Sequence, residues 1–346
     1  MKRVLCIGIL ILSLIFPASA SGVVAPEVPE DVQQLMPPEE NSFGDRLYYL
    51  FSEAFNQAQP AVAAGLKLCI SVFATVLILA LLRNFSGKSK FFVELAGVVA
   101  VACVLMGSTS SMIEMGAQTV MQISQYGKLL LPVMTAALAS QGGSISAASL
   151  YGATVLFDTV LCSLISSILL PMLYIYLVLA IAGAALEDDF LKRLRNLLKK
   201  TMTWCLKTLL YVFTGYISIT GVISGTADQT AIKAAKLTIS GMVPVVGGIL
   251  SDASETILIS AGMVKNTAGI YGFIAILAVA IVPFLTVGIN YLLLQLTSAI
   301  CAVFSPKSMA DLLGDFSSAM GLVLGMTGSV CLIQLISVVC FLRGMS

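Results

Sequence analysis

Residues 149–186 read SLYGATVLFDTVLCSLISSILLPMLYIYLVLAIAGAAL, with Asp158 as their single charged side chain. A membrane-spanning helix needs about 20 mostly apolar residues, so this stretch of about 38 residues is too long for one simple span. Pro171 interrupts the stretch past its midpoint, and a proline removes a backbone hydrogen bond from a helix interior. The stretch therefore predicts a broken membrane helix or a tight pair of helices.

The rest of the chain has the same apolar character. Hydrophobic residues make up 58% of the 346 residues, charged residues make up 11%, and the mean hydropathy is +0.99. This composition lies outside the range of soluble domains and predicts an all-α, multi-pass helical bundle in a membrane. The net charge is +1 and the basic residues are spread over short loops, so we expect no nucleic-acid partner.

The N-terminal residues 1–20 have the pattern of a secretory signal peptide. Lys2 and Arg3 precede an apolar run, and a small-residue cleavage pattern ends at Ala20; an uncleaved first membrane helix is the alternative. Residues 21–64 are strongly acidic, with Arg46 as their single basic residue. They predict an exported acidic arm that leads into a short amphipathic helix around residues 43–58.

Basic residues of the predicted transmembrane domain, residues 65–346, gather in two short stretches. One contains Arg83, Lys88 and Lys90, and the other is residues 187–207. The positive-inside rule places both stretches in the cytoplasm. This indicates a multi-pass protein of the cell membrane with an exported arm, and it leaves the side of the C-terminus open. Spans are expected near residues 65–82, 92–107, 203–223, within 268–304 and near 319–342.

The second basic stretch predicts an amphipathic helix. Phe190 and several leucines recur at helical spacing opposite the basic side chains, which is typical of a helix lying on the inner membrane surface. A plain solvated helix is the alternative. Basic side chains at such a surface would dock a cytoplasmic partner or anionic lipid. The candidate docking residues are Lys192, Arg193, Arg195, Lys199 and Lys200.

Two shorter apolar pieces are interrupted by proline or glycine. Residues 129–139 contain Pro132, and residues 239–250 contain Pro244. Such pieces are typical of re-entrant or half-helices, because unwound backbone in a membrane is tolerated only where protein or water covers it. A second long apolar run, residues 268–304, follows them. The expected architecture is six full spans with two re-entrant pieces, or eight spans.

The two halves of the chain also match each other. Pro244 follows Pro132 by the same number of residues as Pro283 follows Pro171. The possible repeats, residues 90–186 and 200–304, each follow a basic stretch or begin in one, so they would have parallel topology. Apolar sequences match by chance as well, so duplication and coincidence both stay open. In a duplication, the paired interrupted segments would line a central pathway.

Ionisable residues within apolar stretches are the remaining candidates, because they cost free energy unless they face a cavity or a partner. Of these residues, Asp158 lies deepest in its apolar stretch. It has either a role between helices or in a pathway, or a place in a wet external vestibule. Glu94 and Glu114 lie near span ends, where their side chains are expected to extend toward the lipid headgroups. Asp252 and Glu255 follow a Gly-Gly pair and are alternatively a helix cap and a first-turn acid. The pathway candidates are Pro132, Pro244, Gly247, Gly248, Asp158, Asp252 and Glu255.

Enzyme chemistry is not expected. The chain contains no histidine, which removes His-based general-base catalysis, Ser-His-Asp triads and His ligation of zinc or haem. It contains no phosphate-binding Gly-x-x-x-x-Gly-Lys-Ser/Thr motif. Asp158 and Asp315 match the intramembrane aspartyl protease pattern poorly, because Leu312 replaces its first glycine. The cysteines are scattered singly and are expected to be buried small hydrophobes. No cofactor or metal is predicted.

Residues 236–255, KLTISGMVPVVGGILSDASE, and residues 304–309, FSPKSM, resemble the stage III sporulation protein AE family of endospore-forming bacteria. The layout is similar over the whole length, although the N-terminal arm is short for that family. The resemblance implies the core or export gate of a channel-like apparatus that links the mother cell to the engulfed forespore and supports late forespore gene expression. It implies the mother-cell membrane as the location. The implied partners are proteins of the same operon, including a cytoplasmic secretion-type ATPase, ring-forming proteins of the intermembrane space and a forespore membrane protein.

Two other functions stay open. The chain could be an autonomous secondary transporter of a small solute, with Asp158 coupling transport to protons or sodium. It could also be a scaffold that recruits the other components and conducts nothing.

Overall fold

The computed structural model describes residues 26–38, 42–85, 90–140, 144–219 and 267–344. The predicted signal peptide lies outside these residues, as does the segment with Pro244, Gly247, Gly248, Asp252 and Glu255, on which the internal repeat rests. Every regular element in the described residues is helical, which confirms the all-α prediction. The elements are η1 (Glu30–Leu35), α2 (Phe43–Phe85), α3 (Lys90–Ser140), α4 (Ser144–Leu164), the π-helix η3 (Ile165–Leu169), α5 (Leu170–Leu186), α6 (Asp189–Ile219), α9 (Thr267–Phe304) and α10 (Lys307–Gly344).

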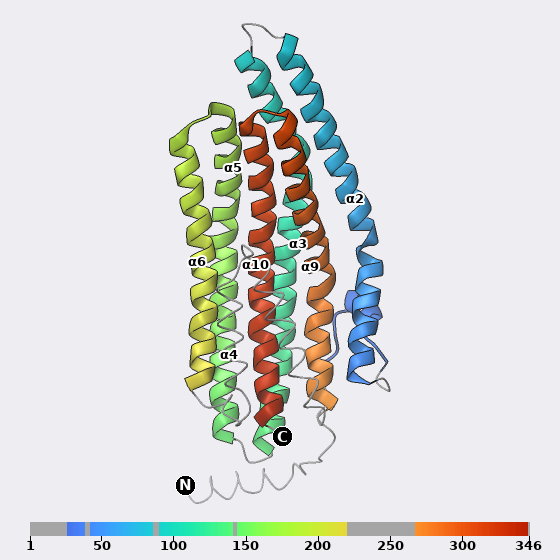
Figure 1. Ribbon diagram of the computed structural model, residues 1–346. Coiled ribbons are helices and arrows are strands. Elements are labelled where there is room, and N and C mark those ends of the chain that lie inside the picture. The colour runs from blue at the N-terminus through green and yellow to red at the C-terminus, as the bar shows by residue number, and fades with distance from the viewer. Residues whose placement is uncertain (1–25, 39–41, 86–89, 141–143, 220–266, 345–346) are drawn as a thin grey trace, which may run out of the picture.

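The long helices run up and down along a common direction and form one bundle (Figure 1). The ends of α2, α5 and α9 meet the starts of α3, α6 and α10 at one end of the bundle, which we name the basic end because Arg83, Lys192 and Lys307 lie there. α10 lies in the middle and packs against α3, α4, α5, α6 and α9. Its apolar side chains are almost all buried, so α10 is the core of the bundle.

Among the described residues, five helical stretches are long and apolar enough to cross a membrane, by length and composition. α6 is not one of them: its first half carries most of the basic residues of the second basic stretch, and the described part of the span expected near residues 203–223 ends at Ile219. The prediction of a multi-pass helical membrane protein is therefore confirmed. The five stretches are Phe43–Arg83, Phe91–Ala139, Ala148–Leu186, Gly269–Phe304 and Lys307–Leu342.

Two helices that were expected to lie apart from the bundle are part of it. Residues 43–58 form the first turns of α2, which continues past Pro60 into the predicted span without a break. Residues 190–198 form the first turns of α6, which runs alongside α5 (Figure 1). The first turns of α2 bury Leu50, Ala54 and Ala58 inside the bundle and so are not a separate arm. The first turns of α6 instead bury Arg195 and leave Phe190 and Leu197 exposed.

The prolines interrupt the helices less than expected. Residues 129–139 are the last part of α3 and not a separate half-helix, with Pro132 on the exposed side. A single proline costs a helix one hydrogen bond, and the buried Leu131 and Met134 hold this part of α3 in the bundle. α9 likewise runs through Pro283. At Pro171 the structure shows neither the predicted broken helix nor a helical pair: α4, η3 and α5 form one continuous helical stretch, and the π-helix η3 ends two residues before Pro171.

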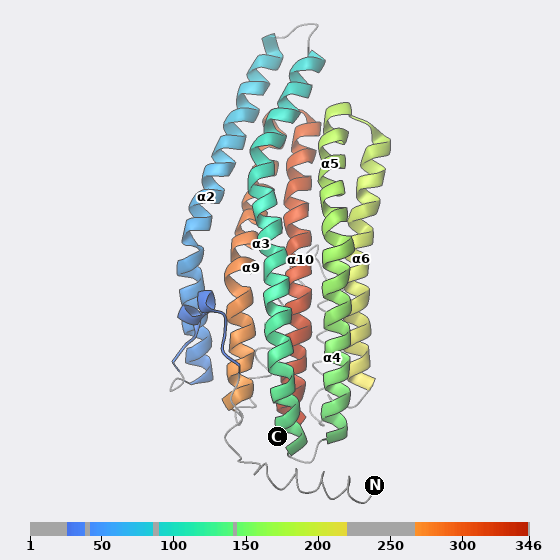
Figure 2. The same ribbon diagram turned by 180° about the vertical axis from the view of Figure 1, so that it is seen from behind.

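The first described part of the acidic arm is packed against the bundle. Val28, Val32 and Leu35 are buried, and η1 contacts α2 and α9. The Tyr126 hydroxyl of α3 donates a hydrogen bond to the Pro26 carbonyl over 3.3 Å. This part of the arm lies toward the end of the bundle opposite the basic end (Figure 2).

Gly116 is required by the close approach of α3 to α10. A methyl group at this position would overlap the Cγ1 atom of Val323, whose β-branched side chain has little freedom to move. Gly107, also on α3, faces open space. Gly116→Ala is therefore expected to lower the melting temperature of the purified protein, with a destabilisation of about 1–3 kcal/mol from overpacking.

Gly107→Ala is the matched control and should leave the melting temperature unchanged or raise it. Both values are measured by fluorescence-detected size-exclusion chromatography after heating. Equal melting temperatures for the two variants would show that α3 and α10 do not meet at Gly116.

Candidate functional site

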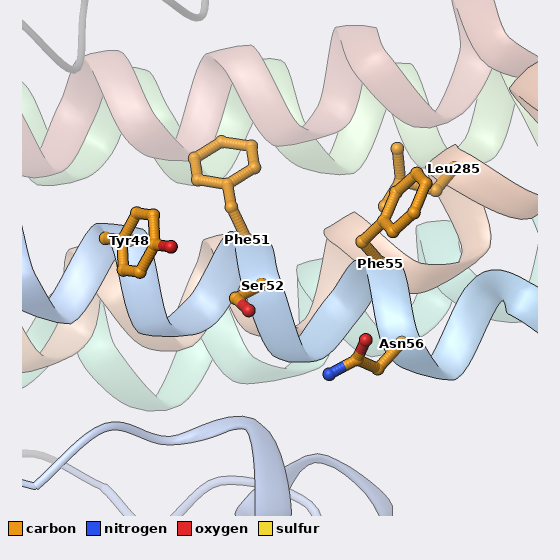
Figure 3. A pocket seen from close by; sticks show the side chains of 6 residues that line it. All are labelled: Tyr48, Phe51, Ser52, Phe55, Asn56 and Leu285. Atoms are coloured by element: carbon orange, nitrogen blue, oxygen red, sulfur yellow. The ribbon is translucent and has the colours of Figure 1, made fainter.

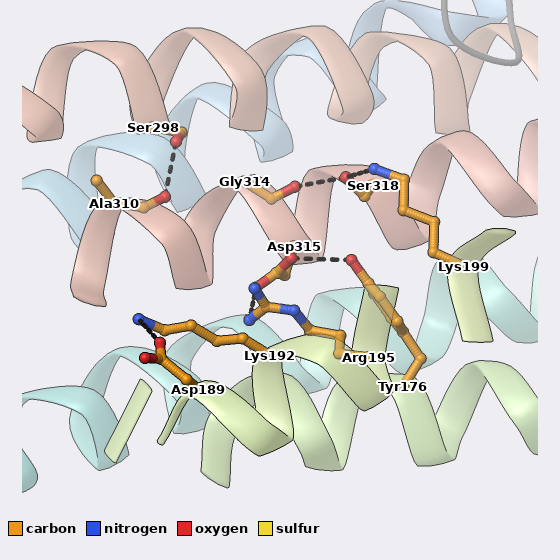
Figure 4. Close-up of polar contacts among 10 residues, drawn as sticks. All are labelled: Tyr176, Asp189, Lys192, Arg195, Lys199, Ser298, Ala310, Gly314, Asp315 and Ser318. Atoms are coloured by element: carbon orange, nitrogen blue, oxygen red, sulfur yellow. Dashed lines mark hydrogen bonds and ion pairs between the residues drawn. The ribbon is translucent and has the colours of Figure 1, made fainter. Parts of the chain in front are cut away.

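A charged cluster lies inside the bundle near the basic end, where α5, α6 and α10 meet (Figure 4). The Arg195 guanidinium of α6 forms an ion pair with the Asp315 carboxylate of α10. The Tyr176 hydroxyl of α5 donates a hydrogen bond to Asp315 Oδ1 over 2.9 Å. Arg195 and Asp315 are 7% and 9% exposed, so this pair is shielded from water. The contacts tie three helices together through one carboxylate.

A second contact extends the cluster along α10. Lys199 Nζ donates to Ser318 Oγ over 2.8 Å, and Ser318 Oγ donates to the Gly314 carbonyl over 2.8 Å (Figure 4). Arg195 and Lys199 are one turn apart on α6, as are Asp315 and Ser318 on α10. Breaking a buried ion pair by removing one partner costs far more than breaking an exposed one. The cluster can therefore fix how α6 sits against α10.

The predicted docking residues divide between the inside and the outside of the bundle. Arg195 and Lys199 turn inward to the charged cluster. Lys192 lies 3.9 Å from the Asp189 carboxylate, which is 85% exposed. Arg193 and Lys200 are exposed. Two of the five candidates are thus parts of the interior, and the sequence pattern alone did not reveal Tyr176 or Asp315 as their partners.

Asp158 lies in a contact between α4 and α3. It is 1% exposed, and Ser124 Oγ donates a hydrogen bond to its Oδ2 over 2.6 Å. The thiol of Cys162 lies 3.9 Å from Oδ1. Of the two placements that the sequence left open, the structure shows the inter-helix contact and not a wet vestibule.

The two aspartates of the protease pattern lie far apart. The Thr154 hydroxyl, one turn from Asp158, meets the Ser337 hydroxyl at 2.6 Å. Ser337 follows Asp315 on α10 by 22 residues (337 minus 315), which is about 33 Å of helix at 1.5 Å per residue. The two carboxylates therefore do not form a catalytic pair.

An open groove of about 380 Å³ lies between α2 and α9 (Figure 3). Tyr48, Phe51 and Phe55 of α2 line it with Leu285 of α9, and the polar groups at its edge are Ser52 and Asn56. It holds no ionisable carboxylate or amine. The described residues also contain no group of three His, Cys, Asp or Glu side chains that could hold a metal ion.

Removal of one partner of the buried ion pair is expected to destabilise the protein. Arg195→Met leaves the Asp315 carboxylate buried without its cation, and such a loss costs about 3–5 kcal/mol. The double variant Arg195→Met with Asp315→Asn should recover most of this stability. Thermal unfolding of the purified proteins measures both effects.

Lys192→Met is the control, because its partner Asp189 is exposed and such pairs contribute little. The interpretation of the cluster is contradicted if Arg195→Met and Lys192→Met melt at the same temperature.

Comparison with known proteins agrees with this architecture. A family model described as stage III sporulation protein AE matches residues 32–343. The stage III sporulation protein AE of Bacillus subtilis (strain 168) is 25% identical over 237 residues, which is 68% of this chain and 58% of that protein. The chain thus spans less than two thirds of that relative, and no solved structure matches it. Because the family match covers nearly the whole described bundle, the chain belongs to the stage III sporulation protein AE family.

Proposed function

We propose that this chain is the membrane core, or export gate, of a channel-like sporulation assembly that connects the mother cell with the forespore and supports late forespore gene expression. Membership of the family and the multi-pass helical bundle support this proposal. The partners we propose are those implied by the family: a cytoplasmic secretion-type ATPase, ring-forming proteins between the two membranes and a forespore membrane protein.

The observation that carries the proposal is the height of the bundle. α2 has 43 residues and α3 has 51, which correspond to about 65 and 76 Å at 1.5 Å per residue, whereas the hydrocarbon layer of a bilayer is about 30 Å thick. A bundle of this height extends into water on at least one side of the membrane. A component that must contact soluble partners needs such a projection, and a simple anchor does not.

The projection has an apolar tip at the basic end. Gly97 of α3 packs beside Leu79 of α2 and Met309, which lies at the start of α10. Residues 80–85 and 90–96 therefore extend past α10 (Figures 1 and 2). We name these residues the hairpin tip. Its exposed apolar side chains are Leu81, Leu82, Phe85, Phe91 and Phe92.

Leu81, Leu82, Phe91 and Phe92 also lie at the ends of the two stretches that are apolar enough to cross a membrane. We propose that the extra height of the bundle carries the tip beyond the hydrocarbon layer, where an apolar surface is costly in water and is typical of a protein contact. The one described ion pair of the tip, Arg83 with Glu94 at 2.8 Å, ties α2 to α3 and leaves the apolar side chains uncovered. By the positive-inside rule the basic end faces the cytoplasm. We therefore propose that the hairpin tip contacts the cytoplasmic part of the assembly, with the acidic arm on the exported side and the bundle in the mother-cell membrane.

The rival functions each rest on a different observation. The buried Asp158 favours an autonomous transporter, because carboxylates inside membranes commonly couple ion movement. The filled centre of the bundle, occupied by α10, favours a gate that is closed in this conformation or a scaffold. Solute uptake by the isolated protein separates the transporter from the gate and the scaffold.

The hairpin tip should be needed for sporulation and not for folding. The double variant Leu82→Ser with Phe85→Ser is expected to accumulate normally in the membrane but to abolish heat-resistant spores in an endospore-forming host lacking its own copy, because the tip loses its apolar contact. Val303→Ser is the control, since Val303 is 76% exposed at the same end but lies outside the tip. Normal spore counts in the double variant would contradict the role of the tip.

Proteoliposomes that contain the protein alone are expected to show no solute uptake driven by a proton or sodium gradient, because the proposed gate needs its partners. The measurement is uptake of a panel of small solutes with each gradient imposed in turn. Uptake that depends on a gradient and is lost in Asp158→Asn would replace the gate by the transporter.

A further inference from the structure

Three helices bring polar side chains together inside the bundle, far from the charged cluster. Asp158 of α4, Ser124 of α3 and Gln334 of α10 are 1%, 4% and 0% exposed. The Ser124 hydroxyl donates to Asp158 Oδ2, whereas Asp158 Oδ1 faces only the weak thiol donor of Cys162 at 3.9 Å. One carboxylate oxygen is therefore poorly satisfied.

The Gln334 side chain is also unsatisfied. Neither Oε1 nor Nε2 has a hydrogen-bond partner, although both atoms are buried. The amide lies over Gly127, where a methyl group would overlap it. Buried amides almost always find partners, so this amide requires an explanation.

Two contacts place the Gln334 amide near the carboxylate, although neither of its polar atoms lies within hydrogen-bond distance of it. Gly127, under the amide, is three residues from Ser124 on α3, and residues at this spacing share a helix face. The Ser337 hydroxyl of α10 also meets the Thr154 hydroxyl of α4. Ser337 is one turn from Gln334, and Thr154 is one turn from Asp158. The amide and the carboxylate therefore lie within about one helical turn of each other at the junction of α3, α4 and α10.

An ionised carboxylate at this depth needs a positive partner. In the described residues no lysine or arginine lies within ion-pair distance of Asp158; the exposed Lys128 of α3, one turn from Ser124, acts electrostatically on the neighbouring Cys162 without pairing with the carboxylate. The three side chains offer oxygen ligands instead: Asp158 Oδ1, the lone pairs of Ser124 Oγ and Gln334 Oε1. Hard oxygen ligands with one net negative charge suit a monovalent alkali cation, because a divalent ion would leave an uncompensated charge.

We infer that Asp158, Ser124 and Gln334 form a binding site for a monovalent cation, Na⁺, inside the membrane bundle. The ion would join α3, α4 and α10 at a level where the described residues supply no other charge pair. This inference goes beyond the proposed gate and does not depend on it, because a cation can brace a gate, a scaffold or a transporter alike.

The test is the thermal stability of the full chain, purified in detergent, in NaCl and in choline chloride of equal ionic strength. A ligand that binds only the folded protein raises its melting temperature in a saturable way. The expected result is a rise of about 3–6 °C in NaCl for a moderate affinity. Asp158→Asn should remove the difference between the salts, whereas Glu114→Gln, an exposed carboxylate of α3, should keep it.

Two further variants keep the test valid if Asp158→Asn fails to fold. Ser124→Ala and Gln334→Leu each remove one oxygen ligand and should raise the Na⁺ concentration at half effect about tenfold or more. Equal melting temperatures of the unaltered protein in the two salts would overturn the site, as would an unchanged Na⁺ response in these variants. Neither result bears on the proposed role of the hairpin tip, which is tested by spore formation.

Discussion

The constraint on which the fold depends is the burial of α10 on all sides. A helix without an exposed face must satisfy each polar side chain from a neighbouring helix or from its own backbone. With the exception of Gln334, α10 does so at different heights: Asp315 bonds to α5 and α6, Ser317 bonds to the Tyr291 carbonyl of α9, and Ser337 meets α4. α4, α5, α6 and α9 are thereby each held at one height relative to α10.

These polar contacts explain why an apolar bundle adopts one arrangement. Apolar side chains pack nearly as well after a small slide of one helix along another, so they specify the register of the helices weakly. A misplaced carboxylate or hydroxyl in a medium of low dielectric constant is costly. The Arg195 and Asp315 pair therefore fixes α6 near the basic end, and the contact of Ser124 with Asp158 fixes α4 against α3 deeper in the bundle.

The sequence predicted the membrane bundle, most of the long helices and an irregularity in residues 149–186, because these follow from apolar length and proline chemistry. It singled out Asp158, which the structure buries at a contact between two helices, but the predicted break at Pro171 is a π-helix within a continuous helical stretch. It did not predict that residues 43–58 and 190–198 continue into longer helices. An amphipathic pattern shows which side is apolar, but not whether lipid or protein covers that side. For the same reason Arg195 and Arg193 are equivalent in the sequence, yet one is buried and the other exposed.

The π-helix η3 between α4 and α5 adds one residue to a helical turn, and each residue advances an α-helix by about 100°. Below η3 the chain presents Asp158 to α3, and above it presents Tyr176 to Asp315 of α10. Without the extra residue, one of these side chains would be turned away from its partner by more than a quarter of a rotation. η3 thus rotates α5 relative to α4, and it allows one continuous helical stretch to present its polar groups in two different directions.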